Sequence, residues 1–298
     1  MDIVADLHLH SKYSRAVSPR MNIHQMAEWG RKKGIDLLAT SDWTHPLWFK
    51  ELKVNLEEVE AGVYQAKSLL RGGRMPARQG LWPQAMAGGD SSDGGTERGG
   101  EPYFVLGTEI ASIYSQGGKG RRIHNLVFAP NLETVEKINA EFSQRGFNLL
   151  ADGRPILGLS SRDLVDLVMT IDENCLVIPA HVWTPYFALY GSKSGFDSLE
   201  ECFQDMSQHI YAVETGLSSD PSMNWRIKDL DQRRIVSFGD SHSPEKIGRE
   251  VTIFKIKKPD EQDSSGMKKL KIKNFNYLDL VRTIKGEGEW QIAYTIEF

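Results

Sequence analysis

The chain has 298 residues, of which 40% are hydrophobic and 26% charged, a balance typical of a globular protein. It contains no apolar run of the roughly 18 residues that a membrane span needs, and its N-terminus lacks the pattern of a signal peptide. The formal net charge of −4 gives no overall attraction to nucleic acid, so any phosphate site has to be a local basic patch. Cys175 and Cys202 form no CxxC pair, which disfavours a disulfide framework or cysteine-ligated zinc and suits a reducing cytoplasm.

Short apolar runs predict buried strands, and the amphipathic stretches between them predict helices. The expected strands are Ile3–Leu9, Ile35–Thr40, Tyr103–Glu109, Ile123–Phe128, Leu176–Ala180, Tyr211–Glu214 and Ile235–Gly239. The expected helices are Ile23–Lys33, Leu132–Arg145, Ser160–Thr170, Ser198–Ser207 and Pro221–Gln232. Strands that alternate with helices indicate βαβ units and a parallel sheet, either open or closed as a TIM-like barrel.

Three segments depart from this alternation. Residues 109–129 (EIASIYSQGGKGRRIHNLVFA) predict a hairpin that turns at Gly117–Gly120. About residues 71–101 are rich in glycine, serine and proline without periodicity, so we expect a flexible and dispensable loop. About residues 255–273 are highly charged, so we expect a solvated excursion, with a DNA-contacting arm as the alternative.

Polar side chains gather where the predicted strands end, and functional residues gather at this edge in sheets of this kind. These positions hold His8, His10, Asp42 with His45, Glu109, His124, His181, Glu214, Asp240 and His242. Six of the eight histidines thus lie at strand ends, and only His24 and His209 fall on predicted helices. Any one of them would suit a structural role, such as a core histidine, but their accumulation favours a shared site.

The residue types at these ends predict a metal cluster. His8 and His10 are two residues apart, so their side chains project to the same side of a strand. Imidazole suits zinc, iron and similar ions, and carboxylates can bridge two ions. Since the set exceeds one tetrahedral site, we expect two or three divalent ions. Such clusters activate water and stabilise the attacking and leaving oxygens of a phosphate displacement.

The motifs DLHLHS, SDW, GTE, the histidine before NLVF, PAH and GDSH resemble the polymerase-and-histidinol-phosphatase (PHP) superfamily of metal-dependent phosphoesterases. The resemblance implies one α/β domain over residues 1–298, a distorted seven-stranded (β/α) TIM-like barrel, with two or three ions of Zn, Mn, Mg or Fe. It implies that the metal ligands are His8, His10, Asp42, Glu109, His124, His181, Asp240 and His242. Of these, it implies a direct catalytic part for Asp240, Glu109 and His242.

The chain departs from the superfamily pattern at two places. Many members have DH where this chain has Asp42–Trp43, so His45 is an alternative ligand there. Many members also have a further histidine where this chain reads YSRAV after His10. The resemblance therefore leaves open whether one metal position is built differently.

Longer blocks, such as PAHVWTPYFALYGSKSGFDSLEECF and DSHSPEKIGREV, are similar to endonuclease Q, a family that nicks DNA on the 5′ side of deaminated bases and abasic sites. This similarity implies DNA as the substrate. That family continues into a four-cysteine zinc module, and the sequence here ends at QIAYTIEF without such cysteines. We therefore expect slow, salt-sensitive nicking with poor discrimination of lesions.

Four basic residues near the strand-end face are candidates for contacts with substrate phosphate: Lys12, Arg15, Arg121 and Arg122. As an alternative, each is a solvated surface charge. Two other functions remain open, a small-molecule phosphomonoesterase of the histidinol-phosphatase kind and a non-catalytic module that binds DNA or metal. The sequence indicates no membrane partner and identifies no protein partner.

Overall fold

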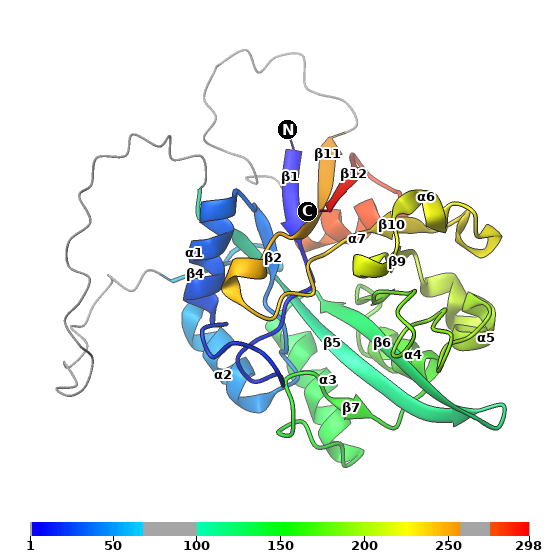
Figure 1. Ribbon diagram of the computed structural model, residues 1–298. Helices are drawn as coiled ribbons and strands as arrows, with labels where there is room; N and C mark the ends of the chain where they lie inside the picture. Colours follow the sequence, from blue (N-terminus) through cyan, green and yellow to red (C-terminus); the bar gives the residue numbers. More distant parts are fainter. Residues whose placement is uncertain (1, 68–99, 257–274, 298) are drawn as a thin grey trace.

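A computed structural model describes residues 2–67, 100–256 and 275–297 of the chain (Figure 1). The structure does not describe residues 68–99 and 257–274. Most of the expected loop (about 71–101) and of the expected charged excursion (about 255–273) therefore lies outside the described residues. In the described ranges, no helix has both the length and the apolar character to cross a membrane.

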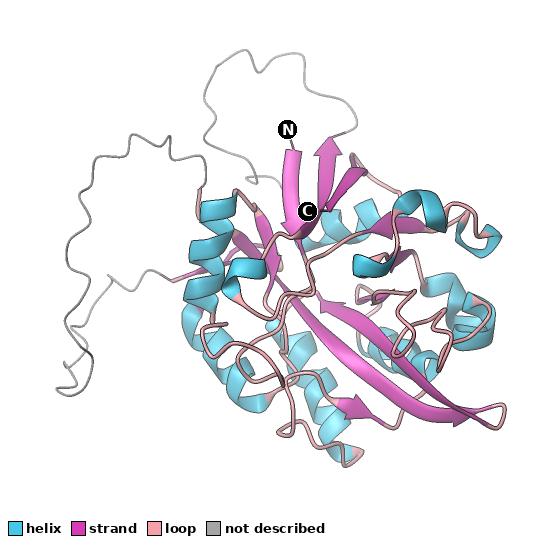
Figure 2. Cartoon of the chain, in the orientation of Figure 1, coloured by secondary structure: helices cyan, strands magenta, loops and turns pink. Residues whose placement is uncertain are grey.

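The structure combines strands and helices along the whole described chain (Figure 2). The strands are β1 (Asp2–Asp6), β2 (Leu37–Ala39), β3 (Leu56–Glu60), β4 (Val63–Ala66), β5 (Tyr103–Gln116), β6 (Lys119–Ala129), β7 (Ile156–Leu157), β8 (Leu176–Pro179), β9 (Ala212–Glu214), β10 (Arg234–Val236), β11 (Glu250–Ile256) and β12 (Trp290–Glu297). The α-helices are α1 (Ile23–Lys33), α2 (Pro46–Asn55), α3 (Leu132–Gln144), α4 (Ser161–Ile171), α5 (Leu199–Phe203), α6 (Pro221–Asn224) and α7 (Tyr277–Lys285).

The strands form a mixed sheet, so the parallel sheet expected from the sequence is present only in part. β1, β2 and β5 are parallel neighbours, as are β9 and β10. β6 is antiparallel to both β5 and β8. The cause is the tight turn at Gly117 and Gly118, because a hairpin connection reverses the chain. Figure 1 shows this long hairpin crossing the molecule.

The described strands pair as one ten-stranded sheet and one two-stranded sheet, β9 with β10, and these pairings include no closed barrel. Two contacts nevertheless link the sheets. The backbone N–H of Val182 donates to the carbonyl of Glu214 at 3.0 Å, which joins the end of β8 to β9. Leu9 forms a parallel bridge with Ser241, which joins the residues after β1 to those after β10.

Two apolar clusters lie on opposite faces of the strands. Alternate strand residues, such as Ala5, Val105 and Phe128, pack with α7 in one cluster, which we call the inner core. Buried residues of α1 to α5 pack in the other cluster. This arrangement follows from the period of two in a strand, which sends successive side chains to opposite faces.

Three of the five predicted helices agree with the structure. α1 has the predicted bounds: the Asn22 side chain accepts from the N–H of Gln25 at its start, and Gly34 adopts a left-handed φ of 71° at its end. The helix predicted at Ser198–Ser207 is correct only in part, because α5 ends at Phe203 and Gln204–His209 form a 3-10 helix. The helix predicted at Pro221–Gln232 is wrong, because α6 ends at Asn224. The Asn224 side-chain amide donates to the Ser219 hydroxyl and to the Asp220 carbonyl, and these local hydrogen bonds favour a turn over a continued helix.

Candidate metal centre

The strand faces that bury the inner core become polar at one end. Glu109 lies on the same face of β5 as Val105, and Glu214 lies on the same face of β9 as Ala212. On β6, His124 shares a face with Leu126 in the same way. All three polar residues are buried. The apolar interior therefore ends in a layer of ionisable side chains.

Other site residues lie on sharp turns directly after strands. Asp42, His181 and Asp240 have positive φ values of 45°, 31° and 43°. Such left-handed conformations strain a residue that has a side chain, typically by about 1–3 kcal/mol, and they concentrate at functional sites. Gly216 leaves room for this arrangement, since a Cβ there would lie 2.5 Å from the His181 Cβ.

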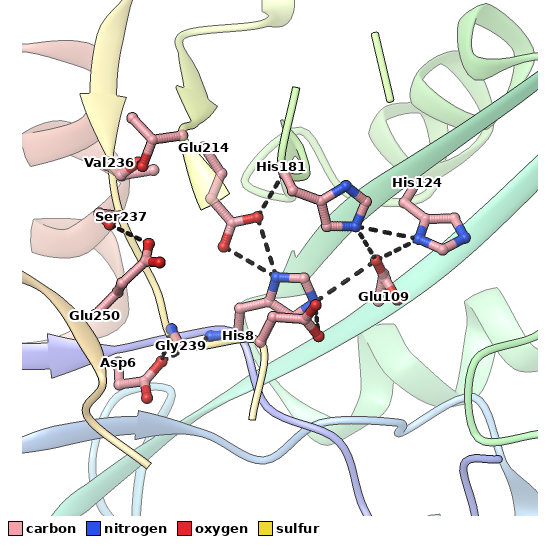
Figure 3. A network of polar contacts seen from close by, with 12 residues as sticks. Asp6, His8, Glu109, His124, His181, Glu214, Val236, Ser237, Gly239 and Glu250 are labelled. Carbon is pink, nitrogen blue, oxygen red and sulfur yellow. Dashed lines mark hydrogen bonds and ion pairs between the residues drawn. The ribbon is translucent and has the colours of Figure 1, made fainter. Parts of the chain in front are cut away.

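The Glu109 carboxylate lies between histidines from several strand ends (Figure 3). Its Oε1 is 2.7 Å from Nδ1 of His124, 3.1 Å from Nε2 of His181 and 3.6 Å from Nε2 of His8. Its Oε2 is 3.5 Å from Nε2 of His10. Glu109 is thus placed to bridge two ligand groups, one at each oxygen.

The Asp240 carboxylate closes the other side of the cluster. Its Oδ1 lies 3.0 Å from Nε2 of His10 and 3.5 Å from Nε2 of His8. Nδ1 of His242 lies 3.6 Å from the same oxygen and 2.9 Å from the Asp240 carbonyl. The structure therefore brings together His8, His10, Glu109, His124, His181, Asp240 and His242, as the sequence predicted.

Two further carboxylates lie behind the histidine pair of the HxH motif. Nδ1 of His8 is 2.9 Å from Glu214, and Nδ1 of His10 is 3.4 Å from Asp42. Asp42 also accepts from the Ser11 N–H at 2.6 Å through its other oxygen. Carboxylates in this position fix the orientation of the ring so that Nε2 faces inward. Asp42, predicted as a ligand, is better placed to orient His10.

The donor set fits divalent metal ions. Three groups each offer ligand atoms within 4.8 Å of one another: His8, His10 and Glu109; His10, Asp240 and His242; Glu109, His124 and His181. Nε2 of His8 is buried and has no hydrogen-bond partner. Because an unpartnered buried nitrogen is costly, a metal ion there would satisfy a need that the protein leaves open.

The carboxylates make the centre strongly attractive to cations. Burial opposes protonation of His8, but the carboxylates around it, with Glu214 first, raise its pKa to about 9. Burial likewise opposes protonation of His10, and Asp240 and Asp42 raise its pKa to about 10. Burial lowers the pKa of His124 to about 4, so this ring is neutral at pH 7 and able to act as a ligand.

Two of the basic residues proposed from the sequence are already paired near the surface. Lys12 forms an ion pair with Glu51 at 2.9 Å. Arg15 lies 3.3 Å from Asp152, and its side chain is 75% exposed. Ion pairs that solvent can reach, as here, are weak, so neither pair prevents a phosphate contact.

The other two proposed basic residues lie on the returning arm of the hairpin. The Arg121 guanidinium lies 3.9 Å from the ring centre of Phe196 and donates to the Gly195 carbonyl, so it is used in packing. Arg122 lies 5.8 Å from the ring centre of Phe187, which itself packs 4.6 Å from the His124 ring. Of this pair, Arg122 is the one near the cluster.

Sequence reasoning missed Arg154, whose Nη1 lies 3.1 Å from Oε2 of Glu109. Together with His124, His181 and Asp240, it lines a pocket of about 250 Å³. It sits in a loop before the two-residue strand β7, in the stretch ADGRPI, where no motif or periodicity marks it. The sequence also left Glu214 outside the ligand set, although its strand-end position was visible.

Comparison with known proteins gives a consistent set of relatives, although no family model matches the chain. The uncharacterized protein YqxK of Bacillus subtilis is 31% identical over 269 residues, which are 87% of this chain and 59% of that protein. The crystal structure of the lesion-specific endonuclease PfuEndoQ from Pyrococcus furiosus matches all of this chain with a TM-score of 0.74 and 25% identity. The chain resembles endonuclease Q.

A second endonuclease Q structure, in complex with a 27-mer duplex that has an abasic lesion at the active site, has the same TM-score and 26% identity. The chain spans 59% and 60% of the lengths of the two endonuclease Q chains. The likeness to endonuclease Q therefore concerns about three fifths of each of those proteins and all of this chain.

Proposed function

We propose that the chain is a metal-dependent phosphoesterase that nicks DNA on the 5′ side of deaminated bases or abasic sites, as a relative of endonuclease Q. The observation that carries the proposal is the convergence of buried histidines on the Glu109 and Asp240 carboxylates. The likeness to a lesion-specific endonuclease and to an endonuclease bound to an abasic duplex supports DNA as the substrate.

In this proposal the metal ligands are His8, His10, Glu109, His124, His181, Asp240 and His242. Divalent ions bound there would activate a water molecule for attack and neutralise charge on the phosphate. Glu109 uses Oε1 toward His124 and His181 and Oε2 toward His10, so it holds the two sides of the centre at a fixed spacing.

The other residues keep this centre in order. Glu214 and Asp42 each hold Nδ1 of a histidine and thereby direct Nε2 inward. The pocket beside the centre has Tyr186, Phe187 and Leu217 in its wall, which give that side of it an apolar surface. Asp240 lies at the boundary between pocket and cluster, where a reacting phosphate would meet both.

The proposal includes a distorted barrel of seven strands: β1, β2, β5, β6, β8, β9 and β10. All seven strands contribute residues to the inner core. The Val182–Glu214 hydrogen bond and the Leu9–Ser241 bridge support closure, because they lie where the two sheets would meet. A barrel would place every strand-end residue of the site around one opening.

The test is a comparison of substrates with one preparation of protein. Labelled DNA containing uracil, hypoxanthine or an abasic site is incubated with Mn, Mg or Zn, beside undamaged DNA and p-nitrophenyl phosphate. We expect metal-dependent nicking of the damaged DNA, abolished by a chelator. Preferential hydrolysis of the small ester would instead indicate a phosphomonoesterase, and bound metal without any turnover would indicate a binding module.

A further inference from the structure

Arg154 brings a positive charge into the pocket beside the metal centre. Of the described residues that line this pocket, it alone carries a fixed positive charge. Its Nη1 lies 3.1 Å from Oε2 of Glu109, and its side chain is 25% exposed. The guanidinium therefore reaches the centre from the pocket side and remains accessible to a small ligand.

The loop that carries Arg154 is held by its neighbours on both sides. The Asp152 carboxylate accepts from the backbone N–H of Arg15 and of Arg154, each at 3.2 Å. The Gly153 N–H donates to the Tyr13 carbonyl at 2.9 Å. The Gly153 carbonyl accepts from the Thr44 hydroxyl at 3.1 Å. These bonds attach the loop to the segment after the HxH motif and to the segment after β2.

The position before Arg154 requires glycine. A Cβ at Gly153 would lie 2.4 Å from Oδ2 of Asp42 and 2.4 Å from Oγ of Ser14. Such distances are far below van der Waals contact, so any side chain would displace the loop or Asp42. The close approach therefore fixes the Arg154 backbone against the same Asp42 that orients His10.

The chemistry of the guanidinium suits a phosphate. It has five N–H donors in a planar fork, which matches two oxygens of a phosphate or carboxylate at once. In the described part of the chain, Glu109 is the hydrogen-bond acceptor that the Arg154 side chain uses. The remaining donors can serve a ligand in the pocket, where the Glu109 and Asp240 carboxylates alone would repel an anion.

We propose that Arg154 is a substrate-contacting catalytic residue that binds a non-bridging oxygen of the scissile phosphate, with Glu109 as its anchor. This inference rests on the proposed function, since it names a residue for the same site. Structural support for Glu109 is the competing explanation, and it makes a different prediction: loss of Arg154 would then loosen a metal ligand.

The experiment compares Arg154→Gln and Arg154→Lys with the wild type, and with Arg145→Gln as a matched control. Arg145 is an exposed arginine at the end of α3 that pairs with Glu141 on the same helix. Three quantities are measured on metal-loaded protein: bound metal, the affinity for inorganic phosphate by calorimetry, and KM and kcat for bis(p-nitrophenyl) phosphate.

We expect Arg154→Gln to weaken phosphate affinity and raise KM about 10- to 100-fold, the range for a lost hydrogen bond to a charged group. Bound metal should stay unchanged, and Arg145→Gln should match the wild type. Arg154→Lys should recover part of the affinity, because it restores charge without the planar fork.

Two results would overturn the inference. One is an unchanged phosphate affinity in Arg154→Gln, and the other is a loss of bound metal large enough to explain the whole loss of phosphate affinity. The proposed function fails separately, if wild-type protein hydrolyses no phosphate ester. In that case the phosphate affinities still decide whether Arg154 binds the anion.

Discussion

Nδ1 of His8 lies 2.9 Å from Oε1 of Glu214, although the two residues are 206 positions apart in the chain. The other oxygen of Glu214 accepts from the backbone N–H of His181 at 2.8 Å. One buried carboxylate from β9 thus positions a residue after β1 and a residue after β8. The contact also settles which nitrogen of His8 faces the centre, since Nδ1 is used and Nε2 is left without a hydrogen bond.

Glu214→Gln should therefore weaken metal binding without removing a proposed ligand. The amide keeps the shape of the side chain but loses the negative charge that makes His8 a stronger metal ligand. Changes at such supporting residues typically cost about 10- to 100-fold in metal affinity. A titration with a competing chelator measures this, with Glu200→Gln on the exposed face of α5 as control. Equal affinities in the two variants would contradict the orienting role.

Asp240→Asn should abolish hydrolysis while the fold stays intact. Asparagine keeps the shape of the side chain but loses the negative charge that lies near both His8 and His10. We expect activity to fall by more than about 100-fold, because removal of one contact to the charge of a transition state has an effect of that size. Turnover and metal content are measured together with the melting temperature. Asp231→Asn, at an exposed position, is the matched control. Activity near that of the wild type with full metal content would refute the role of Asp240.

The buried Glu250 side chain predicts a pH-dependent stability. Burial raises its pKa from 4.5 to about 7, although a hydrogen bond from Ser237 partly opposes the shift. The folded state thus binds this proton more tightly than the unfolded state. The contribution of this group to the free energy of unfolding is therefore fully present below pH 4.5, decreases as the pH rises, and is lost above about pH 7.

Glu250→Gln should remove this dependence, because the amide is neutral at every pH. We expect the variant to match the wild type near pH 4.5 and to be more stable at pH 8, by up to about 3 kcal/mol at 1.4 kcal/mol per pKa unit. Urea unfolding of metal-free protein at both pH values measures the difference. The exposed Glu287 offers a control substitution to glutamine. A variant less stable than the wild type at pH 8 would contradict the assignment.

The candidate ligands could be predicted because local strand patterns place them, although Glu109 and His124 lie inside β5 and β6 and not at strand ends as predicted. Glu109 and His124 follow alternating apolar positions on their strands, and the glycines between them predict the hairpin. The role of Asp42 could not be predicted in this way. It depends on the approach of Gly153 and His10, which are far apart in the chain. Arg154 was missed for the same reason.

The sequence reasoning also passed over elements at the edges of the sheet. The helix α7 has a readable start, since Asn276 and Asp279 form a capping box, and Gly286 ends it in a left-handed conformation. The two residues of β7 are different, because they form a strand only by pairing with Ala111 and Ser112 of β5. Tertiary pairing of this kind leaves no periodic signal in two residues.

The position of the cut in DNA tests the central claim most directly. A duplex with a single uracil or abasic site, labelled at the 5′ end, is incubated with metal-loaded wild-type protein and with Asp240→Asn, and the products are resolved at single-nucleotide length. The account predicts a product that ends immediately 5′ of the lesion, formed slowly by the wild type beside weaker nicking elsewhere and absent with Asp240→Asn. No product at the lesion position, or no cleavage by protein that holds its metal, would contradict it.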